Sequence, residues 1–93
     1  MSLITRNSII SRNGDITFGE LEGEIVMINI EIGKYFNLGN TGSVIWHRLD
    51  RQMSVEALVQ KLMDEYQVDE EQCERDVIRF LNELNKEGLI IVK

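Results

Sequence analysis

The sequence contains no proline, one cysteine (Cys73) and one histidine (His47). A single cysteine cannot form a disulfide within the chain, and these two side chains cannot fill the tetrahedral shell of a zinc site. The absence of proline excludes a proline-rich linker or tail. Basic residues are also few, 10 Lys and Arg against 16 Asp and Glu, so the net charge is −6. This charge disfavours binding to nucleic-acid phosphates or anionic membranes.

Long apolar runs and a secretory signal are missing as well. No apolar run approaches the ~20 residues of a membrane-spanning helix, and residues 1–7 lack the charge and apolar pattern of a signal peptide. We therefore expect a cytoplasmic protein with no membrane partner. The length of 93 residues suffices for one small domain over residues 1–93, in which a deep enzymatic cleft would be hard to enclose.

The first half of the chain has the pattern of antiparallel strands. Asn13 and Gly14 are a two-residue hairpin signal, because both residues tolerate positive φ. They separate residues 8–12 from residues 15–21. The pattern predicts a meander of three or four strands within residues 8–38, depending on whether this hairpin adds a strand.

Two further segments, residues 24–30 and 34–38, complete this predicted meander. In the first of them Val26, Ile28 and Ile30 fall on one side, because side chains alternate along a strand. One continuous apolar face predicts a sheet that is covered on that side by the second half of the chain.

The second half of the chain has helical spacing. Apolar side chains recur at intervals of three and four residues. Helices are predicted at about 41–50, 54–66 and 69–87. Thr41, Ser54 and Asp69 are suitable N-cap residues for the three helices. A small antiparallel meander followed by three helices is an α+β fold with a winged-helix-like arrangement.

The winged-helix arrangement raises the alternative of a DNA-binding regulator. In a helix-turn-helix module the later helix would enter the major groove. Residues 69–88 carry seven acidic and three basic side chains, which DNA phosphates would repel. This charge pattern favours a solvated helix face, and we expect no nucleic-acid partner.

Signals of catalysis are weak. No nucleophile can be proposed that would pair with His47 as a general base. Acidic neighbours of Cys73 oppose thiolate formation, so Cys73 is expected to be a small buried side chain. The glycine-rich segment 39–43 lacks the lysine of a phosphate-binding loop. We expect no catalytic residue, no metal site and no cofactor.

Residues 34–38 form the last strand of the predicted meander, so one edge of this strand lacks a partner. Its free N–H and C=O groups would accept another strand. With the third helix beside it, this edge would form a groove for an extended peptide. The alternative is that a second copy of the chain, or the apolar C-terminal segment 89–92, covers the edge, and the pattern alone leaves both possibilities open.

Residues 34–46, KYFNLGNTGSVIW, resemble the pattern "strand, Leu-Asn-x-Thr-Gly, aliphatic, aliphatic, Trp" of PqqD-like proteins. Three later segments, residues 54–59, 66–69 and 76–89, resemble the same family in order and spacing. The resemblance covers roughly residues 14–92. Gly39 departs from it, because the family has Asn at that position.

The resemblance implies a recognition element for ribosomally made, post-translationally modified peptides. Members have three antiparallel strands and three helices, and they bind the leader segment of a precursor peptide as an added strand. The chain resembles most the free-standing members that occur with lasso-peptide clusters, in which a separate peptidase removes the leader. Carried over by position, the peptide-binding residues would be Lys34, Tyr35, Phe36, Asn37 and Leu38 on the strand, and Cys73, Asp76, Val77, Phe80 and Leu84 on the third helix. A purely structural subunit of a larger enzyme is the other alternative.

Overall fold

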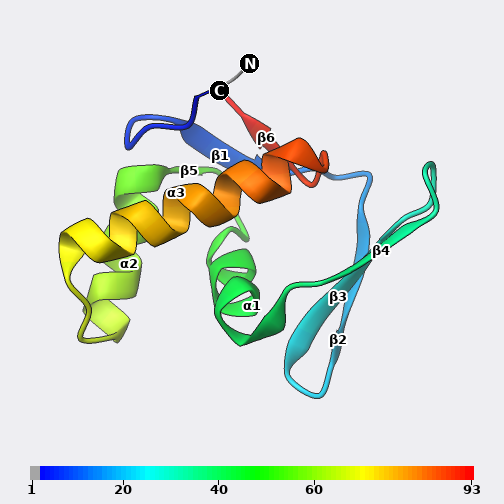
Figure 1. Ribbon diagram of the computed structural model, residues 1–93, viewed down its shortest axis with the longest axis horizontal. Helices are drawn as coiled ribbons and strands as arrows, with labels where there is room; N and C mark the ends of the chain where they lie inside the picture. Colours follow the sequence, from blue (N-terminus) through cyan, green and yellow to red (C-terminus); the bar gives the residue numbers. More distant parts are fainter. Residues whose placement is uncertain (1–2) are drawn as a thin grey trace.

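The computed structural model describes residues 3–93 (Figure 1). The strands are β1 (Ile9–Arg12), β2 (Thr17–Leu21), β3 (Glu24–Asn29), β4 (Lys34–Asn37), β5 (Met53–Ser54) and β6 (Ile90–Val92). The helices are α1 (Gly39–Arg48), α2 (Val55–Glu65) and α3 (Glu70–Lys86). The antiparallel meander β2–β3–β4 precedes the three helices, so the predicted α+β, winged-helix-like arrangement is confirmed. None of these helices is long and apolar enough to cross a membrane.

The segment before the meander belongs to a second sheet, ordered β5–β1–β6, so the predicted hairpin at Asn13 and Gly14 is wrong. The Asn13 side chain donates instead to the Gly88 carbonyl at 2.8 Å, which directs the chain from one sheet to the other. Gly14 does not adopt a positive φ. The two-residue turn with positive φ lies at Glu22 and Gly23, where it joins β2 to β3.

The meander buries the opposite face from the one that the alternation predicts. Ile25 and Met27 of β3 are buried in the core, Met27 completely, whereas Ile28 is 46% exposed. Helix α1 packs against β3 on the buried side. Both faces of β3 are apolar, so the period of two locates the faces but does not decide which one the helix covers.

Two of the three helices begin at the N-cap residue that the sequence predicts. Side-chain oxygens of Ser54 and Asp69 accept hydrogen bonds from backbone N–H groups three residues later, at 3.0 Å each. Thr41 does not cap α1, because this helix begins two residues earlier, at Gly39. The N-cap residue, Leu38, makes no side-chain cap hydrogen bond, and Asn37 Oδ1 accepts the N–H of Gly39, the first helical residue, at 2.9 Å.

One hydrophobic cluster contains residues of both sheets and all three helices. Trp46 of α1 is buried in this cluster, and the partly exposed Phe18 of β2 packs on it edge to face, with ring centroids 5.4 Å apart. The Arg12 guanidinium lies 4.8 Å from the Trp46 ring centroid, and its Nη2 donates to the Trp46 carbonyl. Burial lowers the pKa of Arg12, and the charge of Asp50 acts in the opposite direction. Arg12 thus joins β1 to both the meander and α1.

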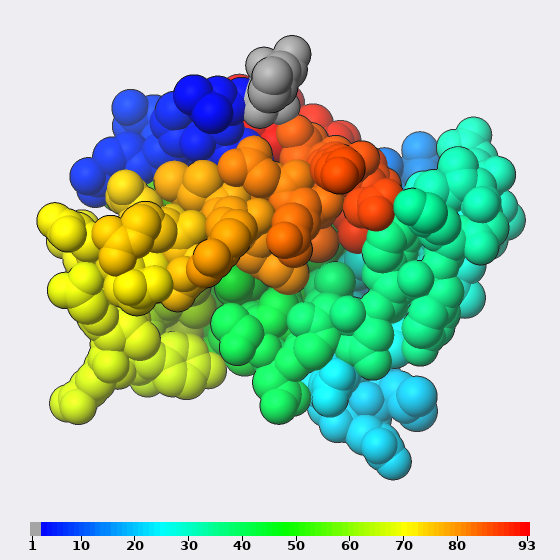
Figure 2. All heavy atoms as spheres, viewed as in Figure 1, coloured from blue at the N-terminus to red at the C-terminus, as the bar shows by residue number. Residues whose placement is uncertain are grey.

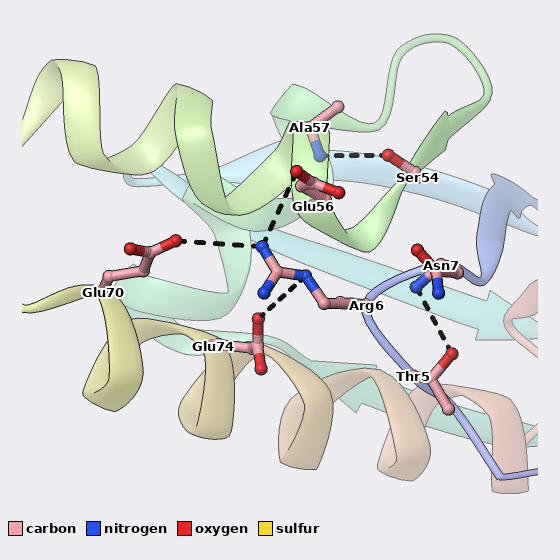
Figure 3. A network of polar contacts seen from close by, with 8 residues as sticks. All are labelled: Thr5, Arg6, Asn7, Ser54, Glu56, Ala57, Glu70 and Glu74. Atoms are coloured by element: carbon pink, nitrogen blue, oxygen red, sulfur yellow. Dashed lines mark hydrogen bonds and ion pairs between the residues drawn. The ribbon is translucent and has the colours of Figure 1, made fainter.

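Arg6 joins the N-terminal segment to the beginnings of α2 and α3 (Figure 3). Its guanidinium lies 3.6 Å from Glu56, 3.9 Å from Glu70 and 3.8 Å from Glu74. The side chains are partly exposed, so each ion pair contributes less than about 1 kcal/mol. The network holds the N-terminal ends of the two helices together.

Candidate functional site

Strand β4 forms one edge of the meander (Figure 1). It pairs with β3 on one side, and within residues 3–93 no strand pairs with its other side. The C-terminal strand β6 pairs with β1 in the second sheet, so it does not cover this edge. The edge is therefore an open template for another strand.

One hydrogen bond determines which backbone groups point outward from this edge. The Leu38 N–H donates to the Ile25 carbonyl at 3.0 Å. Hydrogen-bonded pairs alternate along antiparallel strands, so Phe36, two residues earlier, also directs its N–H and C=O at β3. The N–H and C=O groups of Tyr35 and Asn37 consequently point away from β3, toward the open edge.

An open pocket of about 680 Å³ begins where β4 ends. It lies among the first two turns of α1, the end of α2, the loop before α3 and the part of α3 from Gln72 to Phe80, and we call it the α1–α3 pocket. Figure 2 views this side of the molecule, with the orange atoms of α3 above the green atoms of α1. Its lining is mainly apolar, which suits it to apolar side chains of a ligand.

The pocket brings together half of the predicted peptide-binding residues. These are Leu38, Cys73, Asp76, Val77 and Phe80. Leu84, by contrast, is only 4% exposed, belongs to the core and does not line the pocket.

The other predicted residues lie on β4 beside the pocket. Tyr35 and Asn37 are exposed, and Phe36 is half-buried against the core. Lys34 directs its ammonium group to Glu87 at the end of α3, with 3.2 Å between Nζ and Oε1. Leu38 follows β4 directly and also lines the pocket. The run of predicted strand residues therefore leads into the pocket.

Helix α1 approaches Phe80 closely because it carries a glycine at this point. A Cβ atom at Gly42 would lie 2.7 Å from Cζ of Phe80 and 2.8 Å from Cε1. Carbon atoms do not approach this closely, so any larger residue at position 42 would displace the aromatic ring. Gly42 thus determines how deep Phe80 sits between α1 and α3.

Two polar side chains of α3, Gln72 and Asp76, line the pocket. Asp76 Oδ1 accepts hydrogen bonds from Gln72 Nε2 at 3.0 Å and from Arg79 Nη2 at 2.6 Å. Burial raises the pKa of the Cys73 thiol, and the charge of Asp76 raises it further, so this thiol is protonated and a poor nucleophile at neutral pH. Within residues 3–93 no group of three or more His, Cys, Asp or Glu side chains is placed to hold a metal ion.

Sequence reasoning missed two kinds of pocket residue. The first turns of α1 contribute Gly39, Asn40, Thr41, Gly42, Val44 and Ile45. The end of α2, the loop after it and the first turn of α3 contribute Leu62, Tyr66, Val68 and Gln72. Tyr66 and Val68 are apolar and follow directly after α2, but no local signal in the sequence places them at the pocket.

The family model described as coenzyme PQQ synthesis protein D (PqqD) matches residues 24–90. The chain belongs to the PqqD family. The match extends from β3 to the first residue of β6, so this PqqD-family region contains both the open β4 edge and the α1–α3 pocket. The family resemblance of the sequence is confirmed. A comparison with curated protein sequences finds no match.

Two solved structures are similar to this PqqD-family chain. One is described as TbiB1 in complex with the TbiA(beta) leader peptide, with a TM-score of 0.79, 30% identity, and coverage of 86% of this chain and 93% of that chain. The other is described as lasso peptide synthetase B1 complexed with the leader peptide, with a TM-score of 0.76, 25% identity, and coverage of 88% and 96%. Both similar structures thus contain a bound leader peptide.

Proposed function

We propose that this chain is a non-catalytic adaptor in the biosynthesis of a lasso peptide. It binds the leader segment of a ribosomally made precursor peptide and delivers it to a separate leader peptidase or modifying enzyme. The two similar structures, both leader-peptide complexes, support the class of ligand.

The observation that carries this proposal is the continuity between the open β4 edge and the α1–α3 pocket. A peptide strand beside β4 would exchange main-chain hydrogen bonds with Tyr35 and Asn37. Its chain would then reach Leu38, where the pocket begins. Main-chain hydrogen bonds would supply affinity that is independent of sequence, and the pocket would select apolar side chains.

Phe80 and Asp76 have different roles in this proposal. The Phe80 ring is half-buried in the free protein and supplies an apolar wall against which a ligand side chain packs. Both contacts of Asp76 with neighbouring side chains use Oδ1, so Oδ2 is the oxygen that would accept a hydrogen bond from a peptide hydroxyl or amide. Both residues lie on α3, across the pocket from α1.

An adaptor accelerates a reaction without reacting groups of its own. Holding the precursor next to the enzyme turns their encounter into an intramolecular event with an effective concentration that reaches the millimolar range for short linkers. The protonated state of Cys73 agrees with a binding role for the pocket.

The test is a titration of the full chain with a fluorescently labelled synthetic peptide that has the leader sequence of the cognate precursor. A scrambled peptide of the same composition is the control. We expect saturable binding of the leader alone, with a Kd below tens of micromolar. No binding in that range would refute the proposal, and co-purification with an enzyme without leader binding would favour a purely structural subunit.

A further inference from the structure

The side of the meander that faces away from α1 is apolar, and no helix or strand within residues 3–93 covers it. In the strand register Ile28 of β3 lies between Thr17 and Tyr35, and Tyr35 is 61% exposed. Leu21 at the end of β2 has the same alternation and is also exposed. We call these residues, together with Val26, the outer sheet face. Figure 1 shows helices on the other side of this sheet only.

The turn between β3 and β4 extends this apolar surface. Ile30 and Ile32 lie in this turn, and both are more than half exposed. Scattered exposed apolar residues are normal on proteins, but contiguous ones mark interaction sites. The turn follows β3 directly, so its exposed isoleucines continue the outer sheet face.

Acidic residues border the outer sheet face at both ends. Glu22 and Glu24 lie at the turn between β2 and β3, and Glu31 lies in the turn before β4. None of these three carboxylates forms an ion pair with another residue of the described chain. Lys34, the one basic residue of this region, is paired with Glu87. A partner with complementary charge would have an apolar centre bordered by Lys and Arg.

This charge pattern disfavours a second copy of the chain as the occupant. Two copies would bring identical acidic borders together, and each copy has a net charge of −6. Strands spaced about 4.8 Å apart with a rise of about 3.3 Å per residue give a three-stranded face of roughly 250 Å². A stable interface buries about 800 Å² per partner, so any protein that docks on the outer sheet face must also contact surface beside it.

A bound peptide would enlarge the same surface. A strand added to β4 continues the pleated sheet, so every second side chain of the peptide would lie beside Tyr35 and Asn37 on the outer side. The outer sheet face and the peptide would then form one surface. A protein that docks there would contact the domain and its cargo together.

We propose that the outer sheet face is the docking surface for the enzyme that acts on the bound peptide, through an apolar patch bordered by basic residues. This inference rests on the proposed function. Because the peptide supplies part of the surface, the enzyme binds the peptide-loaded domain more tightly than the empty domain. By linkage, the enzyme also tightens peptide binding by the same factor.

The test uses the full chain, the synthetic leader peptide and the purified leader peptidase that processes the same precursor. Ile28→Asp introduces a charge at the centre of the face, and Ile28→Thr keeps the β-branched shape, so that the second variant folds even if the first does not. Ile91→Asp is the matched control, because Ile91 of β6 is also 46% exposed but lies in the other sheet. Leader affinity is measured first for each protein.

We expect both Ile28 variants to bind leader like the wild type, with peptidase affinity at least tenfold lower for Ile28→Asp and unchanged for Ile91→Asp. We also expect saturating leader to tighten peptidase binding to the wild type at least fivefold. Unchanged peptidase binding by Ile28→Asp would overturn the docking proposal alone, whereas failure of the wild type to bind leader would overturn the proposed function as well. A wild-type dimer in sedimentation velocity that Ile28→Asp dissociates would show that a second copy occupies the face.

Discussion

Phe80→Ala tests the pocket most sharply, because the ring contacts α1 on one side and is open to a ligand on the other. In the free protein the variant loses contacts with Gly42 and the core. The ring is only half-buried, so the free energy of unfolding falls by less than the ~3–5 kcal/mol of a fully buried phenylalanine. The fold therefore persists, and binding can be measured.

The loss of binding follows from the area that a ligand would cover. A phenylalanine side chain offers about 200 Å², and at the intermediate exposure of Phe80 roughly a quarter of it, about 50 Å², remains for a ligand. The ligand buries a similar area against the ring, which together gives about 2.5 kcal/mol at ~25 cal/mol per Å². We therefore expect a loss of about 1–3 kcal/mol, which raises the Kd for the leader peptide about 5- to 150-fold.

The assay is isothermal titration of leader peptide into wild type, Phe80→Ala, Phe80→Leu and Phe18→Ala. Phe80→Leu retains most of the apolar surface and should lose less affinity than Phe80→Ala. Phe18 is the matched control, because it is a partly exposed phenylalanine that packs on Trp46 away from the pocket. Equal leader affinity for wild type and a folded Phe80→Ala would refute the role of the pocket.

Two further predictions concern the same pocket. Gly42→Ala should displace the Phe80 ring, lower the melting temperature and weaken leader binding. Gly19→Ala is the control, because there is open space around its Cβ, and it should change neither the melting temperature nor leader binding. Alkylation of Cys73 by iodoacetamide should be slower at pH 8 than in the urea-unfolded chain, because the raised pKa leaves less thiolate, and should rise with pH. Saturating leader should slow this reaction further, and an unchanged rate would place the peptide outside the pocket.

The sequence predicted elements whose signals are local. The caps of α2 and α3 and the end of α3 depend on Ser54, Asp69 and Gly88, and each lies where the pattern requires it. The positive φ of Gly88 also explains why the chain can turn directly into β6. Such signals act within a few residues, so no knowledge of tertiary structure is needed to interpret them.

Features that depend on distant partners were not predictable in this way. The turn residues Asn13 and Gly14 allow a hairpin, but β1 finds its partners in β5 and β6, which lie 40 or more residues later in the chain. The choice between the two apolar faces of β3 depends likewise on where α1 packs. Local patterns offer both possibilities in each case, and the tertiary contacts select one.

The residues of the candidate site differ in the same way: local spacing predicts some of them, and tertiary contacts determine the others. Val77 and Phe80 could be assigned to one side of α3 by helical spacing, and both line the pocket. Leu84 has the same spacing but lies deeper in the core, and the pocket extends along α3 only as far as Phe80. The loop residues Tyr66 and Val68 reach the pocket because α2 and α3 pack together, and no local signal gives that packing.

Amide hydrogen exchange with and without leader peptide is the most direct test of the claim that β4 binds the peptide. Strand addition at β4 predicts that the exchange of the Tyr35 and Asn37 amides slows at least tenfold at saturating leader, because these N–H groups face the open edge. The amides of Phe18 and Glu20 face the opposite, unpaired edge on β2 and should not change. Unchanged exchange at Tyr35 and Asn37 in the saturated complex would contradict the claim that β4 binds the peptide.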